Sequence, residues 1–243
     1  MRELFRVALS LALLVVQPTA AAAELPLPPF RASFSVVGLG IPAGDADFIL
    51  EQAGDNRWRF VARILPNVVA RTLGVDAQRQ ESLFRYQDGT VIPEQFIETR
   101  ERDDAITATA EFHWQRSVVI ITELDTKRRI PIEQRPLYDE ASLYVALMLD
   151  LKREQLPASY LALGAGKVRN YELQPAGDRR VQTALGPVDT VGVKRERTGR
   201  DRRTTLWCAP AYHYLPVLIV QERSGHEVLR MTLTAIEGLE ARP

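Results

Sequence analysis

The sequence predicts a mainly β fold: an antiparallel sheet that curls into a barrel-like or half-barrel domain with one substantial α-helix. Three observations support this prediction. Most of the chain alternates apolar and polar residues with a period of two, which is typical of half-buried strands. Gly, Pro, Asn and Asp separate these segments at the spacing of an antiparallel meander. A single segment, residues 139–153, repeats its apolar residues at helical spacing instead.

The first half of the chain supplies most of the clear alternation. Residues 30–36, 46–50 and 58–64 are predicted to form the first three strands of a meander, divided by glycine-containing turns. Asp88-Gly89 is a strong hairpin signal, and the segments on either side of it are expected to pair. The strands that follow the first three are predicted at residues 82–86, 91–102, 108–114 and 117–124.

Residues 139–153 are predicted to form the helix. Tyr144, Leu147, Met148 and Leu151 recur at helical spacing. Asp139 can cap the first turn, with a serine three residues later where a capping box has Glu or Gln. A lone amphipathic helix of this kind is expected to cover one sheet face or to plug an opening.

Strands return after the helix. Pro175-Ala176-Gly177 and Gly186-Pro187 are interpreted as turns between them. About a dozen strands in one sheet exceed what a flat open sheet tolerates, so curling or closure is expected. The predicted strands are residues 167–174, 181–185, 188–197, 202–207, 217–221 and 228–239.

The first 23 residues have the organisation of a secretory signal peptide. Arg2 and Arg6 give a positive start, and residues 7–16 form an uncharged apolar stretch. That stretch is shorter than the roughly 20 residues that a membrane-spanning helix needs, which disfavours the alternative of an uncleaved anchor. Ala21-Ala22-Ala23 is a small-residue cleavage site that would leave Glu24 at the mature N-terminus. We therefore expect a periplasmic protein.

Residues 24–243 are expected to form a single domain, because no linker or shift in composition divides them. The chain has 31 basic and 31 acidic residues, so no overall field favours binding to nucleic acid. No segment after the signal is long and apolar enough to span a membrane. The oligomeric state is not indicated by the sequence.

Motifs for catalysis, metal binding or cofactor binding are not found, and we expect a protein that is not an enzyme and has no cofactor. The three histidines, His113, His213 and His226, lack metal-ligand spacing. Cys208 is the only cysteine and is expected to be a small buried side chain. Two basic runs, residues 127–129 and 194–203, are interpreted as solvated hairpins, with contact to an anionic glycolipid as the alternative.

Five aromatic residues are the candidate site residues. Their expected role is either core packing or the lining of a ligand cavity, because aromatic rings with polar tips suit both. Prolines flank the C-terminal group, which indicates an irregular crossing between strands. The five are Trp207, Tyr212, Tyr214, Trp114 and Phe112.

The chain resembles the DUF3108 family of bacterial exported proteins of unknown function. The resemblance rests on the segment from Trp207-Cys208-Ala209-Pro210 to Tyr212-His213-Tyr214-Leu215-Pro216 and on three further stretches, and it spans residues 30–238. It implies a β-rich, barrel-like exported protein and supplies no catalytic residues. The further stretches are residues 38–44, 139–153 and 185–191.

Two functions are compatible with these features. The first is a non-enzymatic binder or carrier of an apolar or amphipathic envelope molecule, since a curled sheet of this size can enclose a cavity. The second is a structural or assembly partner that docks another envelope protein through an exposed strand edge. An enzyme of unrecognised type is a third and less favoured reading, because fold class alone does not decide function.

The signal peptide gives the first testable prediction. The mature protein is expected to begin within a few residues of Glu24 and to fractionate with soluble periplasmic proteins, because signal peptidase cleaves after small residues. N-terminal sequencing of the protein from its own cells measures this. Retention of Met1 on membrane-bound protein would contradict it.

Overall fold

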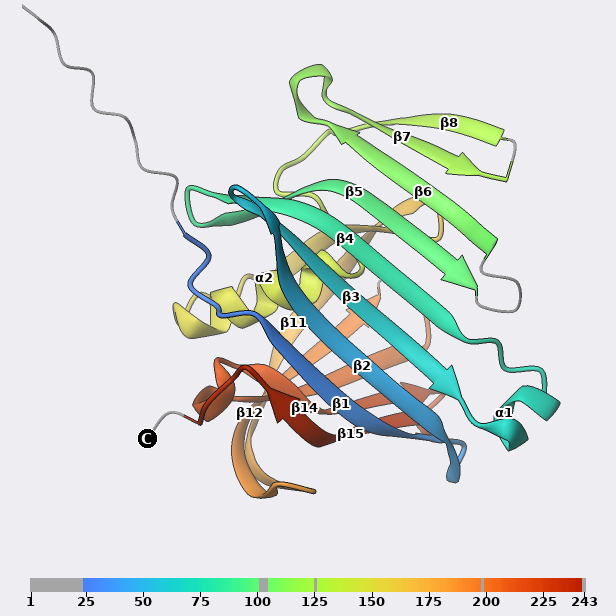
Figure 1. Ribbon diagram of the computed structural model, residues 1–243, viewed down its shortest axis with the longest axis vertical. Coiled ribbons are helices and arrows are strands. Elements are labelled where there is room, and N and C mark those ends of the chain that lie inside the picture. The colour runs from blue at the N-terminus through green and yellow to red at the C-terminus, as the bar shows by residue number, and fades with distance from the viewer. Residues whose placement is uncertain (1–23, 101–104, 125, 198, 242–243) are drawn as a thin grey trace, which may run out of the picture.

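The computed structural model describes residues 24–241 except 101–104, 125 and 198, and most of them belong to one large sheet (Figure 1). The predicted signal peptide, residues 1–23, lies outside the described residues. The strands are β1 (Phe30–Gly38), β2 (Ile41–Gly54), β3 (Arg57–Pro66), β4 (Gln78–Gln87), β5 (Thr90–Arg100), β6 (Ala105–His113), β7 (Val118–Glu123), β8 (Thr126–Pro131), β9 (Tyr138–Asp139), β10 (Ser159–Gly164), β11 (Lys167–Thr183), β12 (Gly186–Arg197), β13 (Arg202–Ala209), β14 (Leu215–Arg223) and β15 (His226–Glu237).

The sheet is built from two meanders that meet at its centre. Strands β1 to β8 follow one another outward in one direction, and β15 to β10 do so in the other. The meanders join because β1 pairs with β15 in antiparallel register, with Val36 opposite Met231. At one edge β9 adds in parallel to β10. The predicted mainly β, curled, barrel-like fold is confirmed, and the sheet is not closed by a backbone ladder between its edges.

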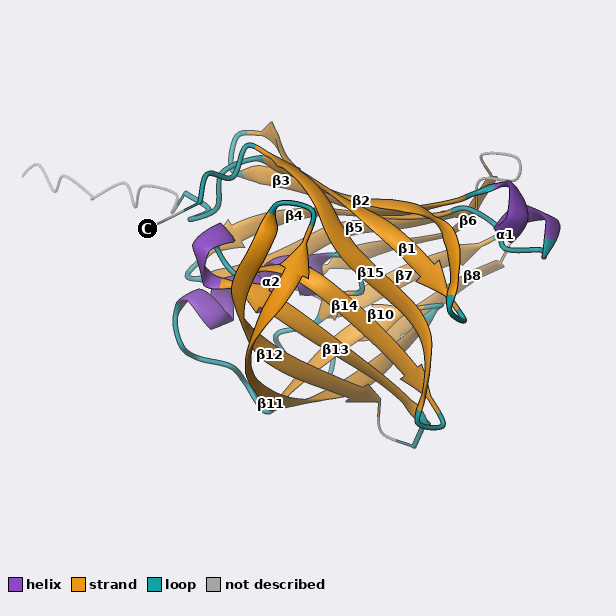
Figure 2. Cartoon of the chain, turned by 90° about the horizontal axis from the view of Figure 1, so that it is seen from below, coloured by secondary structure: helices purple, strands orange, loops and turns teal. Residues whose placement is uncertain are grey.

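The main helix, α2 (Ser142–Lys152), lies inside the curl at one end, whereas the short α1 (Val68–Thr72) lies at the other (Figure 2). The side chains of Leu143, Val145 and Ala146 are buried, as are those of residues 147–149. Burial of successive positions means that protein surrounds the helix. The buried positions therefore extend beyond the predicted set of Tyr144, Leu147, Met148 and Leu151, and the helix plugs one end of the curl, which is one of its two expected roles.

A reciprocal capping arrangement starts α2. Asp139 Oδ1 accepts hydrogen bonds from the backbone N–H of Ser142 at 2.8 Å and of Ala141 at 3.0 Å. In return Ser142 Oγ accepts from the Asp139 N–H at 3.1 Å. Ser142 thus does what Glu or Gln does in the usual capping box, and orphan N–H groups of the first turn are satisfied. The predicted cap at Asp139 is confirmed.

The same carboxylate holds the curl together. Asp139 Oδ2 accepts a hydrogen bond from Ser82 Oγ of β4 at 2.6 Å, and both residues are buried. The next residue, Glu140, accepts from Gln80 Nε2 of β4 at 3.2 Å. Side chains therefore connect the β9 edge to the inner face of β4, while β6 to β8 continue past this point (Figure 1).

An aromatic cluster fills the space between α2 and the central strands. The Phe48 ring lies 5.0 Å from that of Phe34, 5.5 Å from Phe60 and 4.7 Å from Tyr144 of α2. These distances are within the favourable range for tilted and edge-to-face ring pairs. Phe34 and Phe60 are fully buried, so the cluster belongs to the core.

Three details of the sequence-based prediction need correction. The turn predicted at 175–177 is a bulge within one long strand, β11: Pro175 pairs with Val193 and Gly177 with Gly192, which leaves Ala176 as the extra residue. Gly177 adopts φ 78°, the conformation that suggested a turn. Strands β8 and β10 were not predicted, because β8 is a polar edge strand and β10 a run with little alternation.

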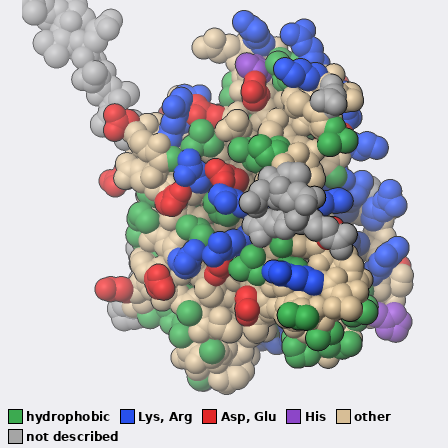
Figure 3. All heavy atoms as spheres, turned by 45° about the vertical axis from the view of Figure 1, so that its right-hand side comes forward, with side chains coloured by type: hydrophobic (Ala, Val, Ile, Leu, Met, Phe, Trp, Pro, Cys, Tyr) green, Lys and Arg blue, Asp and Glu red, His purple; other side chains and the backbone are tan. Residues whose placement is uncertain are grey.

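Acidic and basic side chains pair across the outer face of the N-terminal strands. Arg59 contacts Glu51 and Glu81, each at 2.9 Å, and Arg63 contacts Asp47 at 2.7 Å. To the left of the grey segment in Figure 3, acidic and basic side chains lie next to one another. Exposed pairs of this kind add little stability, but they balance the charge of this face.

The buried carboxyl of Asp139 gives a prediction about pH. Burial raises its pKa from 3.8 to about 6, so the folded protein holds this proton more tightly than the unfolded chain does. The contribution of this group to stability therefore falls as pH rises from about 4 to about 6. The Asp139→Asn variant keeps an acceptor for the helix N–H groups but has no carboxyl at this position, so this pH-dependent loss of stability does not occur. Relative to wild type, its free energy of unfolding should rise by roughly 3 kcal/mol between pH 4 and pH 7.

Urea unfolding at a series of pH values measures this difference. Asp55→Asn, in the exposed turn after β2, is the matched control, since it removes a carboxyl that is not buried. Parallel stability profiles for wild type and Asp139→Asn would contradict the assignment.

Candidate functional site

A cavity of about 1410 Å³ occupies the end of the curl that α2 does not fill. Tyr144 of α2 lies on its lining, and Ala70 and Leu73, from α1 and the residue after it, lie at the other end. The N-terminal and C-terminal meanders form its walls, so residues far apart in the sequence face one another across it. This volume is above that of many drug-sized ligand pockets, which is roughly 300–1,000 Å³.

One wall of the cavity is apolar. It consists of the inward-facing residues of β1, β2, β3 and β15, where the period-two alternation places apolar side chains on the inside. Phe48 is part of the aromatic cluster, so this wall continues directly into the core. The wall residues are Val36, Phe48, Ala62, Ile64, Leu229 and Met231.

The facing wall is polar and basic towards the mouth. On β12 the inward-facing positions run from buried Val193 to Arg195 and Arg197. On β13 they run from buried Leu206 to Thr204 and Arg202. Strand β14 repeats the pattern, from Ile219 to Gln221 and then Arg223. Each strand thus changes from buried core residues to arginine along one face, through a neutral polar residue on β13 and β14 and directly on β12.

A hydrogen-bonded cluster around Glu140 lies on the lining between these walls. Glu140 Oε1 accepts from Arg169 Nη1 at 2.9 Å and from the Tyr171 hydroxyl at 2.7 Å. The glutamate side chain occupies the space beside Gly164, where a Cβ atom would lie 2.1 Å from the carboxylate. Burial, and then the charge of Glu140, raises the pKa of Tyr171. This tyrosine therefore remains a neutral hydrogen-bond donor at physiological pH.

Glu98 faces the same cluster from β5. Burial raises its pKa, and the negative charge of Glu140 raises it further. A carboxyl with this shift carries a full negative charge less readily.

Large apolar side chains are exposed at the mouth. Leu39 is 75% exposed, Val69 55% and Leu73 73%, and all three also line the cavity. Exposed apolar groups gathered at an opening commonly mark a binding surface. An entering apolar molecule would contact this rim before it reached the interior.

None of the five candidate aromatics lies on the cavity lining. Phe112 is buried in the core, and the ring of Trp114 stacks on it at 5.8 Å. Tyr212 and Tyr214 are half-buried against the core beside η2 (Pro210–Tyr212).

Trp207 lies on the face of β13 opposite to Leu206, hence opposite to the cavity. Its ring packs over Gly192, where a Cβ atom would approach it to 2.6 Å. The guanidinium of Arg179, on β11, lies 4.6 Å from the centre of the Trp207 ring. These contacts assign Trp207 to packing between strands.

The cavity arginines were not singled out from the sequence. The run 194–203 was interpreted as a solvated hairpin, which describes Lys194 and Glu196 but not Arg195 or Arg197. Alternation within the run separates the two faces and could have revealed this. What it could not supply is the apolar wall, most of which comes from β1–β3, more than 100 residues away in the sequence.

Chemically reactive groups are scarce in the described part of the chain. Cys208 is free and fully buried, and burial raises the pKa of its thiol. Among the described residues, no group of three or more His, Cys, Asp and Glu side chains is placed to hold a metal ion. Nor is any helix of that part long and apolar enough to cross a membrane.

One known protein family covers nearly all of the strands described above. The model of the family described as "Protein of unknown function (DUF3108)" matches residues 30–234, from the first residue of β1 to near the end of β15. The chain belongs to the DUF3108 family. No curated protein gives a significant match to it.

Among solved structures, the DUF3108 chain is similar to a β-barrel-like protein of the domain of unknown function DUF1849 from Brucella abortus. The TM-score is 0.54 at 11% identity, over 87% of this chain and 98% of the other. This likeness concerns the fold alone. MucB also matches, at 12% identity over 89% of this chain and 55% of MucB, with a low TM-score of 0.29.

The position of Trp207 in this DUF3108 protein gives a prediction. Trp207→Ala should lower the free energy of unfolding by about 2 kcal/mol, roughly half the cost of truncating a fully buried aromatic side chain. Binding of an apolar dye in the cavity should be unchanged, since the ring lies on the other face of β13. Chemical unfolding and dye titration measure the two effects. Normal stability with lost dye binding would contradict this placement.

Proposed function

We propose that this protein is a non-enzymatic binder or carrier that takes an apolar or amphipathic molecule into the cavity. The observation that carries the proposal is a large cavity with one continuous apolar wall and an apolar rim. Apolar surface left accessible to water in a folded protein costs free energy, and a bound apolar ligand recovers it. Concave and largely apolar sites of this kind are typical of small-molecule binding.

We further propose that the protein acts in the periplasm after removal of residues 1–23. The order of the N-terminal sequence supports this, and so does the position of the first buried residues. Leu25 and Leu27 pack into the core, and Lys152 of α2 donates a hydrogen bond to the Pro26 carbonyl at 2.7 Å. Cleavage after Ala23 would therefore leave all core residues of the described part of the chain in the mature protein.

Docking of another envelope protein on a strand edge is the second candidate. Strand β8 is an edge of the sheet, so one side of its backbone has no partner strand among the residues that the structure describes. Its central residues are Lys127, Arg128 and Arg129, and charged residues on an edge oppose the addition of a further strand. The cavity is for this reason the stronger basis for a function.

Titration with N-phenyl-naphthylamine, an uncharged apolar dye that fluoresces in apolar surroundings, tests the binding proposal. Ala62→Trp places an indole on the apolar wall and should weaken dye binding about tenfold or more, because the indole occupies the space beside the wall in which the dye would lie. Ala235→Trp, at an exposed position of β15, is the matched control and should bind as wild type does.

Circular dichroism on both variants shows whether the fold is retained. Wild-type protein that does not bind the dye would overturn the proposal. Equal binding by wild type and folded Ala62→Trp would place the dye elsewhere and would also overturn it.

A further inference from the structure

Three arginines form a row across adjacent strands at the mouth of the cavity. Arg202 of β13 pairs directly with Arg223 of β14. Glu196 pairs with Arg203, so the next positions in the β12–β13 register are Arg197 and Arg202. All three arginines line the cavity. Neighbouring strands lie about 5 Å apart, so the row brings three guanidinium groups within reach of one small anion.

The row has no acidic partner among the described residues. Arg197 and Arg223 form no ion pair there, and Arg202 donates a hydrogen bond to the neutral side chain of Gln221. Like charges directly opposite one another on paired strands destabilise a sheet. Four carboxylates share the cavity lining: Asp76, Glu98, Glu140 and Asp201. Because no ion pair is present within the row among the described residues, we infer that its positive charges are available to a ligand.

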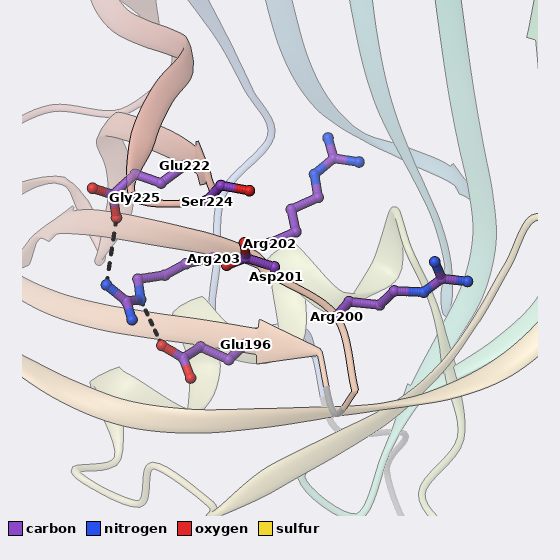
Figure 4. Close-up of a pocket in the computed structure, with 8 residues that line it drawn as sticks. All are labelled: Glu196, Arg200, Asp201, Arg202, Arg203, Glu222, Ser224 and Gly225. Atoms are coloured by element: carbon purple, nitrogen blue, oxygen red, sulfur yellow. Dashed lines mark hydrogen bonds and ion pairs between the residues drawn. The ribbon is translucent and has the colours of Figure 1, made fainter.

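The opposite face of the same strands shows the contrast. Arg203 contacts Glu196 at 2.5 Å and Glu222 at 3.8 Å, so its charge is balanced within the protein. Figure 4 shows Arg200 and Arg202 extending away from this ion-paired group. Alternation along β13 thus places balanced charge on one face and unbalanced positive charge on the cavity face.

A fourth arginine lies one step deeper. Arg195 has its guanidinium carbon 5.0 Å from the ring centre of Tyr171 and 5.9 Å from that of Tyr144. Contact with aromatic rings orients a guanidinium group and does not use its N–H groups as hydrogen-bond donors, so these remain available to a ligand. No ion pair joins Arg195 to a carboxylate in the described part of the chain.

The β1–β3 part of the apolar wall faces this row across the cavity, and its β15 part lies on the strand next to that of Arg223. A molecule that placed an acidic group on the arginines would have its remaining length beside Ile64, Leu229 and Met231. The two walls together match a molecule with one anionic end and one apolar chain. Guanidinium groups bind carboxylate and phosphate oxygens through paired, charge-assisted hydrogen bonds.

We propose that the cavity selects anionic amphiphiles: the row of Arg197, Arg202 and Arg223, with Arg195 below it, binds the carboxylate or phosphate headgroup, and the wall of β1–β3 and β15 holds the apolar chain. This assignment rests on the proposed binding function and adds the ligand class to it.

Competition against the bound dye tests the selection with four compounds that share a dodecyl chain. They are dodecanoate, dodecyl phosphate, uncharged dodecanol and cationic dodecyltrimethylammonium, each used below its micelle concentration. The two anions should bind about tenfold or more tightly than dodecanol, because hydrogen bonds to charged groups are stronger than those to neutral ones. The cation should bind more weakly than dodecanol. Comparison of the two anions distinguishes a fatty-acid carboxylate from a phospholipid-type phosphate.

The triple variant R197Q/R202Q/R223Q should lose most of the preference for anions and keep its affinity for dodecanol. It removes repulsion within the row and should fold, and R223E at the exposed end of the row is a second variant with the same expected direction. Arg203→Gln, on the ion-paired face of β13, is the matched control and should keep the preference. Added salt should reduce the preference in wild type.

The outcomes separate the two proposals. Failure of all four compounds to bind would overturn the binding function itself. Equal binding of the anions and dodecanol would overturn the anionic selection and leave the binding function standing. Competition by inorganic phosphate alone, equal to that of dodecyl phosphate, would show an anion site without a chain site and would also overturn the assignment.

Discussion

The carboxylate of Asp139 joins three parts of the fold that lie far apart in the sequence. It caps the first turn of α2, it sits on the short edge strand β9, and it accepts a hydrogen bond from Ser82 of β4. A fully buried carboxylate is costly unless its oxygens are satisfied, so this position tolerates little displacement. The helix is thereby fixed inside the curl, and the edge of the sheet is held against its own inner face without a closing ladder of backbone hydrogen bonds.

The cavity follows from the lengths of the elements that this contact brings together. Helix α2 has 11 residues and spans about 16 Å, whereas β3 has 10 residues and spans about 33 Å. A helix anchored at one end of such strands cannot fill the space between them. The aromatic cluster closes the core beneath the helix, and the remaining interior towards α1 stays open. The hollow is therefore a property of the architecture, and the side chains of the strands decide its chemistry.

Those side chains differ between two groups of strands, and β15, with Leu229 and Met231, belongs with the apolar group. The N-terminal strands β1–β3 are apolar on the inside as far as the mouth, while β12–β14 change to threonine, glutamine and arginine. On β13, Arg203 on the outside is paired with glutamates, whereas Arg202 on the inside donates to the neutral Gln221 side chain. An interior with unbalanced positive charge facing an apolar wall supports an amphipathic ligand better than a purely apolar one.

The sequence by itself determined the fold class, most strands and the helix with its Asp139 cap, because these depend on local periodicity and turn chemistry. The family followed from the resemblance of particular segments, and the family model confirms it. The sequence also indicated the bulge residues of β11, although as a turn, since Gly177 has the same backbone conformation in both. The cavity was decided only by the tertiary structure. Ile64 and Arg202 are unremarkable in their own strands, and they become opposite walls of one site only because β1 pairs with β15 and the sheet curls around a helix too short to fill it. Alternation gives the face of each side chain, but it does not give what lies across from that face.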